Sequence, residues 1–219
     1  MSVFPVQKMA KVTRQFRVMV KTSTQQRDRV FAIAYEEPAK AYELARTIKN
    51  PWYACQALAC VGRFWPHRDF KKIIAESIQV GSLEEDPYIV AASAAWPVGA
   101  LMERDLYPQA EATLLSALRT CRSISHPSSH AQATFLLFQA VKHFELSLWI
   151  APLDALACPE SRCSHWRQKR NLRDAIAMLR HGDIEEMKAS GAGKQTIQLA
   201  TEFLGSPNHR VAMPRAFFP

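Results

Sequence analysis

The chain has 219 residues, of which 48% are hydrophobic and 22% are charged, a composition that excludes a wholly disordered or collagen-like protein. Its 28 lysines and arginines exceed its 20 acidic residues, so the formal net charge is +8, and its 7 glycines are too few for glycine-rich phosphate loops to be expected. No apolar run reaches the roughly 18–20 residues that a membrane span needs. We therefore expect a globular protein without a membrane span, built as one domain or one run of repeats.

The charge is distributed unevenly along the chain. Residues 1–27 contain six basic and no acidic residues, residues 28–158 contain 12 basic and 14 acidic ones, and residues 159–219 contain 10 basic and six acidic ones. This pattern predicts three regions. They are a basic N-terminal arm or segment at 1–27, an α-helical repeat array at 28–158, and a basic helical C-terminal region with a tail at 159–219.

The N-terminal region allows more than one interpretation. Residues 12–20 alternate well enough for a strand, but the basic residues around them are also spaced as on a helix. Five cysteines without the regular spacing of a disulfide framework favour free thiols in a cytoplasmic protein. An acid-free N-terminus is also typical of an organellar targeting peptide, so targeting by residues 1–27 is the alternative.

Three dipeptides mark the middle of the chain at intervals of 36 and 40 residues: Asn50-Pro51, Asp86-Pro87 and His126-Pro127. Asparagine and aspartate are good N-cap residues, and proline is favoured at the first helical position because the N–H it lacks would be unpaired there. Each dipeptide therefore predicts the start of a helix, with His126 the weakest of the three caps.

Apolar residues at helical spacing precede and follow each of these starts, which predicts two helices per repeat. Pro97 predicts a kink or an end in the second of these repeats. A period of 36–40 residues with two helices per unit is typical of an α-solenoid.

The segments ELARTIKNP (residues 43–51) and CQALACV (residues 55–61) resemble a unit of tetratricopeptide-like or HEAT-like bacterial repeat proteins. The resemblance covers about residues 36–145, is weakest in the third unit, and lacks the full tetratricopeptide signature. It implies a helical scaffold that binds other macromolecules, and it transfers no catalytic residue.

The C-terminal region predicts three further helices. A basic helix is expected at residues 166–180, a second helix begins at Asp183, and a third runs from about Lys194 to Leu204 before Gly205 ends it. The remaining tail carries apolar residues near its end, and we expect it to be loosely held or docked on the surface.

Two places in the sequence carry cysteine or histidine residues at spacings that occur in metal sites. Cys158, Cys163 and His165 form a C-x4-C-x-H pattern that lacks a fourth ligand at motif spacing. His126 and His130 are four residues apart but lack the intervening glutamate of H-E-x-x-H. The sequence therefore predicts no metal at either place.

Residues 191–194 (GAGK) resemble part of a phosphate loop but lack its full spacing and its preceding strand. The simpler interpretation is a turn between helices. No nucleophile elbow or Cys/His signature is present either, so the sequence predicts no catalytic residue and no cofactor.

Aromatic residues after the repeat prolines and a basic–aromatic cluster near the C-terminal helix are the candidates for contact with a partner, because basic side chains bind phosphates and aromatic rings stack. These candidates are Trp52, Tyr53, Tyr88, Arg162, Trp166, Arg167, Lys169, Arg170 and Arg173. The alternative is that the aromatic residues hold the first helical turns against their neighbours and that the basic residues are a solvated surface.

These patterns predict an all-α protein, a short right-handed α-solenoid of helix-turn-helix repeats with a helical C-terminal cap. The leading hypothesis is a non-enzymatic scaffold for protein–protein interaction. One alternative is a HEAT-like nucleic-acid-binding protein that uses its basic ends, and a second is an enzyme built on the helical array. The sequence leaves the oligomeric state open.

Overall fold

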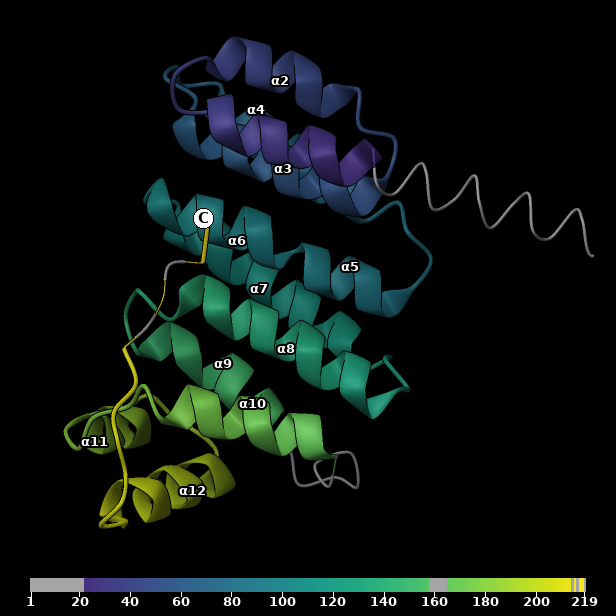
Figure 1. The fold of residues 1–219 in the computed structure, drawn as a ribbon. Helices are drawn as coiled ribbons and strands as arrows, with labels where there is room; N and C mark the ends of the chain where they lie inside the picture. The colour runs from purple at the N-terminus through teal and green to yellow at the C-terminus, as the bar shows by residue number, and fades with distance from the viewer. Residues whose placement is uncertain (1–21, 158–164, 214, 216, 219) are drawn as a thin grey trace, which may run out of the picture. The chain divides into compact units, whose positions relative to one another are not determined.

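The computed structural model describes residues 22–157, 165–213, 215, 217 and 218. Their regular secondary structure is entirely helical, which confirms the predicted all-α class. The chain forms two compact units, Met1–Leu83 and Glu84–Pro219, whose helices are labelled in Figure 1.

This division falls at a different place from the predicted boundaries at residues 27 and 158. Residue 27 lies inside a helix at residues 22–33, and the side chain of Arg27 bonds to the buried Gln56 in the same unit. Residue 158 does not separate two domains, because the helices before and after it pack together in the second unit. The net charge along the chain changes because of surface residues. The buried residues on the two sides of each predicted boundary belong to the same unit.

The first unit contains the helix at residues 22–33, α2 (Pro38–Arg46), α3 (Pro51–Phe64) and α4 (Phe70–Gly81). Asn50 caps α3 as predicted, because its side chain accepts a hydrogen bond from the backbone N–H of Tyr53 at 3.3 Å. Helix α3 contacts both α2 and α4. Gly62 allows the close approach of α4, since a Cβ at this position would lie 2.5 Å from a side-chain carbon of Ile74.

The second unit begins with α5 (Pro87–Ser93) and α6 (Ala95–Glu103), followed by α7 (Tyr107–Cys121) and α8 (Pro127–Val141). Asp86 caps α5 by accepting a hydrogen bond from the N–H of Tyr88 at 2.8 Å, while His126 makes no side-chain cap. The interruption at Ala94, three residues before Pro97, is the predicted break.

The chain continues through α9 (Ser147–Leu156), α10 (Trp166–Ile176), α11 (Asp183–Ala189) and α12 (Lys194–Gly205). Helix α8 contacts every helix from α5 to α10 and is the centre of the unit. Its fully buried Phe138 packs against Trp149 of α9, with their ring centroids 5.6 Å apart. An aromatic pair of this kind anchors α9 to the centre.

Helix α10 ends at Ile176, which corrects the prediction of a helix to residue 180. Ala177 is the C-cap of α10, and its carbonyl accepts a hydrogen bond from the N–H of Ala212. A segment distant in sequence thus supplies a donor for a carbonyl at the end of this helix. The tail then lies beside α6 (Figure 1), where the buried Phe218 fills the space that Gly99 leaves by having no side chain. The end of the tail is therefore docked.

Candidate binding site on helix α10

Helix α10 is held by polar contacts on its buried side. At its N-terminus, Nδ1 of His165 accepts a hydrogen bond from the N–H of Arg167 at 3.2 Å. Gln168 donates from Nε2 to the carbonyl of Leu156, and Asn171 donates from Nδ2 to the carbonyl of Ala131 at 3.0 Å. Both amide side chains are buried, so these bonds fix which faces α10 presents to solvent.

The first exposed face centres on Trp166, whose residue surface is 58% exposed. The guanidinium carbons of Arg167 and Arg170 each lie 5.3 Å from the ring centroid, within the range of a cation–π contact. Among the described residues, no carboxylate pairs with either arginine. We call Trp166, Arg167 and Arg170 the Trp166 cluster.

Tyr88, at the start of α5, lies close enough to this cluster to feel its charge. Burial raises the pKa of Tyr88, and the positive charge of Arg167 opposes that rise. The fold therefore brings together two predicted site residues that are far apart in the sequence.

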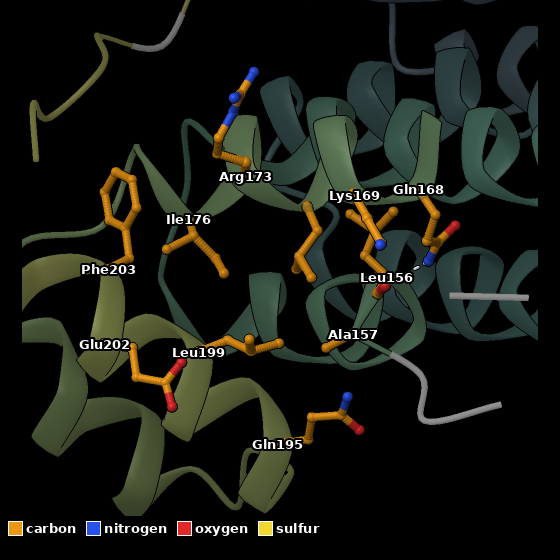
Figure 2. A pocket seen from close by; sticks show the side chains of 11 residues that line it. Leu156, Ala157, Gln168, Lys169, Arg173, Ile176, Gln195, Leu199, Glu202 and Phe203 are labelled. Carbon is orange, nitrogen blue, oxygen red and sulfur yellow. Dashed lines mark hydrogen bonds between the residues drawn. The ribbon is translucent and has the colours of Figure 1, made fainter. Parts of the chain in front are cut away.

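The second exposed face of α10 lines a pocket of about 540 Å³, the volume range of binding pockets in proteins. The pocket lies between α10, α12 and the end of α9, and most of its surface is apolar. Figure 2 shows Ile176 of α10 and Leu199 of α12 extending into the space between the two helices. We call this pocket the α10–α12 groove; it is lined by Leu156, Ala157, Gln168, Lys169, Leu172, Arg173, Ile176, Gln195, Leu199, Glu202 and Phe203.

The charges at the groove differ between its two sides. Helix α10 contributes the exposed Lys169 and Arg173, and Arg173 has a distant ion pair with Asp174 at 4.0 Å. In Figure 2 the guanidinium of Arg173 points away from the apolar floor. Helix α12 contributes Glu202, which accepts a hydrogen bond from Gln198 at 2.8 Å. The α10 side of the groove is therefore cationic.

The other predicted partner-binding residues lie elsewhere. Trp52 and Tyr53 belong to the first unit and are half-buried, and the guanidinium of Arg27 lies 5.2 Å from the Tyr53 ring centroid. Arg162 lies outside the described residues. The structure thus brings five predicted residues together on α10, with Tyr88 close to Arg167.

The predicted turn at residues 191–194 joins α11 to α12. Asp154 of α9 accepts hydrogen bonds from the N–H of Gly193, at 3.0 and 3.1 Å to its two oxygens, and from the hydroxyl of Thr196. A carboxylate of the chain itself thus occupies the N-terminus of α12, where an anion is favoured.

The cysteines and histidines of the described residues form no group of three potential metal ligands, counting acidic residues as well. Cys158 and Cys163 of the C-x4-C-x-H pattern lie outside the described residues, and His165 is the cap of α10. Cys55, Cys60 and Cys121 are buried and form no disulfide bond with one another. Burial raises the pKa of the Cys121 thiol to about 11, which keeps it protonated and unreactive at neutral pH.

The α12 side of the groove was missed in the sequence analysis. Leu199, Glu202 and Phe203 lie on one face of the predicted final helix, and their helical spacing was visible. What the spacing could not show is that this face of α12 and α10 together line one pocket.

Comparison with known proteins finds no family model, no curated protein and no solved structure that matches the chain. Within the part of the chain that the structure describes, no helix has the length and apolar character required to cross a membrane.

Proposed function

We propose that the chain is a non-enzymatic helical scaffold that binds a protein partner, and that the α10–α12 groove receives an apolar segment of that partner. The observation that carries the proposal is the groove itself, a pocket of about 540 Å³ with an apolar floor between two helices. Grooves of this kind take an amphipathic helix whose apolar residues recur every three or four positions.

The contacts within the second unit support a scaffold of stacked helix pairs, in line with the resemblance to tetratricopeptide-like and HEAT-like proteins. Helix α8 contacts its neighbours α7 and α9 and also the next-but-one helix α10, and α7 likewise contacts α9. Helices in a stack of pairs make contacts of both kinds.

The charge at the groove specifies the partner segment further. Lys169 and Arg173 lie on the α10 side, and no described carboxylate pairs with Lys169. A partner with Asp or Glu beside its apolar residues would place negative charge against this side, which favours recognition and correct orientation.

A displayed library of random peptides of about 16 residues tests this proposal with a defined probe. Peptides are selected on the full chain, and the binding of each enriched peptide is then measured to the native chain and to Leu199→Glu, which places a charge in the floor of the groove. We expect enriched sequences to carry apolar residues at helical spacing with Asp or Glu beside them, and to bind Leu199→Glu at least about tenfold more weakly, since a buried unpaired charge is costly.

Thr201→Glu is the matched control, because Thr201 is exposed on the same helix and does not line the groove. It should leave peptide binding unchanged. Peptides that bind native chain and Leu199→Glu equally well, or enriched sequences rich in lysine and arginine, would contradict the proposal.

A further inference from the structure

The Trp166 cluster differs from an ordinary solvated basic surface in how its arginines are held. A guanidinium held over an aromatic ring by a cation–π contact still has N–H groups that can donate hydrogen bonds to another group. Arg167 and Arg170 both lie 5.3 Å from the ring centroid of Trp166. Nε of Arg167 is buried without a hydrogen-bond partner, and within the described chain no side-chain bond of Arg170 uses its donors.

Helix α10 is itself positive around the cluster. It carries Lys169 and Arg173 besides Arg167 and Arg170, and Asp174 is its only acidic residue. The first turn of α10 contains no acidic residue, and the N-terminus of a helix adds partial positive charge at Trp166 and Arg167. This end of the helix therefore attracts an anion.

We propose that Trp166, Arg167 and Arg170 form a phosphate-binding site for single-stranded nucleic acid. The two guanidinium groups present paired N–H donors that match the oxygens of a backbone phosphate. Trp166 remains 58% exposed, and an exposed indole ring next to bound phosphates offers a surface on which an unpaired base stacks. The charge of Arg167 acts on the half-buried Tyr88, which we therefore expect at the edge of the same site.

An anionic membrane is the competing source of phosphate, and the composition of α10 argues against it. A helix that lies in a membrane interface needs an apolar face opposite its basic face. Trp166 is the one large hydrophobic residue of α10 that is exposed, while the other apolar residues of this helix are buried or line the groove.

This inference does not rest on the proposed protein partner. The Trp166 cluster uses positions 166, 167 and 170, whereas α10 lines the groove with positions 168, 169, 172, 173 and 176. At about 100° per residue these sets occupy different faces of the helix. Leu199→Glu should therefore leave nucleic-acid binding intact, and variants of Trp166 or Arg170 should leave peptide binding in the groove intact.

The test is fluorescence anisotropy of the full chain with a labelled oligothymidine of about 20 nucleotides, at salt concentrations from about 50 to about 200 mM. We expect binding that weakens with salt. Arg170→Ala should weaken it several-fold and reduce the slope of log K against log salt by about 0.7, the contribution of one phosphate on a single strand. Trp166→Ala should weaken it about fivefold or more, the effect of losing one stacked base.

Two further variants separate this site from general electrostatic attraction. Arg119→Ala removes an exposed arginine of α7 and changes the net charge by the same amount as Arg170→Ala. Because Arg119 is not part of the proposed site, the affinity for the oligonucleotide should stay within about twofold of native. Arg170→Lys keeps the charge but loses the planar stacked donor, so it should bind the oligonucleotide more weakly than the native chain.

Four results would overturn the proposal. These are no binding at the lowest salt, equal losses for Arg170→Ala and Arg119→Ala, native affinity in both Arg170→Lys and Trp166→Ala, and a preference for duplex DNA of the same length. Binding to phosphatidylserine vesicles in place of the oligonucleotide would assign the site to a lipid surface and would also reject a nucleic acid. Circular dichroism of each variant confirms that the helices are retained.

Discussion

Each unit of the molecule contains an arginine–aromatic cluster, and the two clusters differ in what their arginines bond. In the first unit, Arg27 lies 5.6 Å from the ring centroid of Phe31 and 5.2 Å from that of Tyr53. Its side chain donates to Oε1 of the buried Gln56 at 2.9 Å and to Oδ1 of Asp28 at 2.6 and 3.0 Å. In the second unit, Arg167 and Arg170 contact Trp166 equally closely but make no such side-chain bonds within the described residues.

The comparison teaches that arginine beside an aromatic ring does not by itself identify a binding site. Both clusters satisfy the geometric requirement of a cation–π contact. The donors of Arg27 are already bonded inside the protein, so its cluster stabilises the fold. Arg167 and Arg170 make no comparable side-chain bonds to the described residues, and this difference is the basis for proposing that their donors bind a ligand.

The N-terminus of α12 is a third site to compare with the two clusters. A variant at this site should have the largest effect on stability. Asp154 supplies an internal anion to the N-terminus of α12, through bonds to Gly193 and Thr196. Asp154→Ala should lower the free energy of unfolding by roughly 2–3 kcal/mol, because it removes charge-assisted bonds and leaves the buried Thr196 hydroxyl unpaired. Urea unfolding followed by circular dichroism measures the change.

Asp154→Asn is the informative companion to this variant, because the amide oxygen still accepts a hydrogen bond while the charge is gone. It should lose about half as much stability as Asp154→Ala. If the free energy of unfolding of Asp154→Ala stays within about 0.5 kcal/mol of native, α12 needs no anion at its N-terminus. That result would contradict the interpretation that the Asp154 carboxylate fills this position.

The direct test of the comparison replaces one arginine of each cluster by alanine. Arg27→Ala should cost about 2 kcal/mol, because it leaves Oε1 of the 1%-exposed Gln56 without its partner. Arg170→Ala should stay within about 0.5 kcal/mol of native, as expected for an exposed side chain without bonds to other described residues. Denaturant unfolding of both variants decides the matter, and equal losses would remove the distinction between a structural and a binding cluster.

Local features of the fold could be predicted from the sequence. The caps of α3 and α5 were predicted because Asn50 and Asp86 bond to N–H groups only two or three residues away. The end of the final helix was predicted within one residue, since the helix ends at Gly205 with Ser206 as its C-cap. In these cases the sequence neighbours are also the bonding partners.

Features set by distant residues could not be predicted. The early end of α10 involves Ala212, and the cap of α12 comes from Asp154, 39 positions before Gly193. The same holds for the candidate site. Tyr53 and Tyr88 both follow a repeat proline, and only the fold shows Arg27 over the first and Arg167 near the second. The bond from Arg27 to Gln56, 29 positions away, likewise depends on a contact that no local pattern encodes.

The smallest expected effect concerns the titration of Tyr88. Burial raises its pKa and the charge of Arg167 opposes the rise, so Arg167→Gln should raise the pKa of Tyr88 further. NMR of tyrosine rings labelled at Cζ, with the signal assigned by Tyr88→Phe, measures the pKa. Arg119→Gln on α7 is the control of equal charge change and should leave it unmoved.

The sign of the accompanying stability change follows from linkage. A tyrosine whose pKa is raised by folding contributes stability below its unfolded pKa, near 10, and loses it as the pH rises through the folded value. Arg167→Gln should therefore make the second unit lose more stability above pH 10 than the native chain does, with little change at neutral pH from this titration. An unchanged Tyr88 titration in Arg167→Gln would place the guanidinium away from the phenol, and Tyr88 would then no longer belong to the edge of the Trp166 cluster.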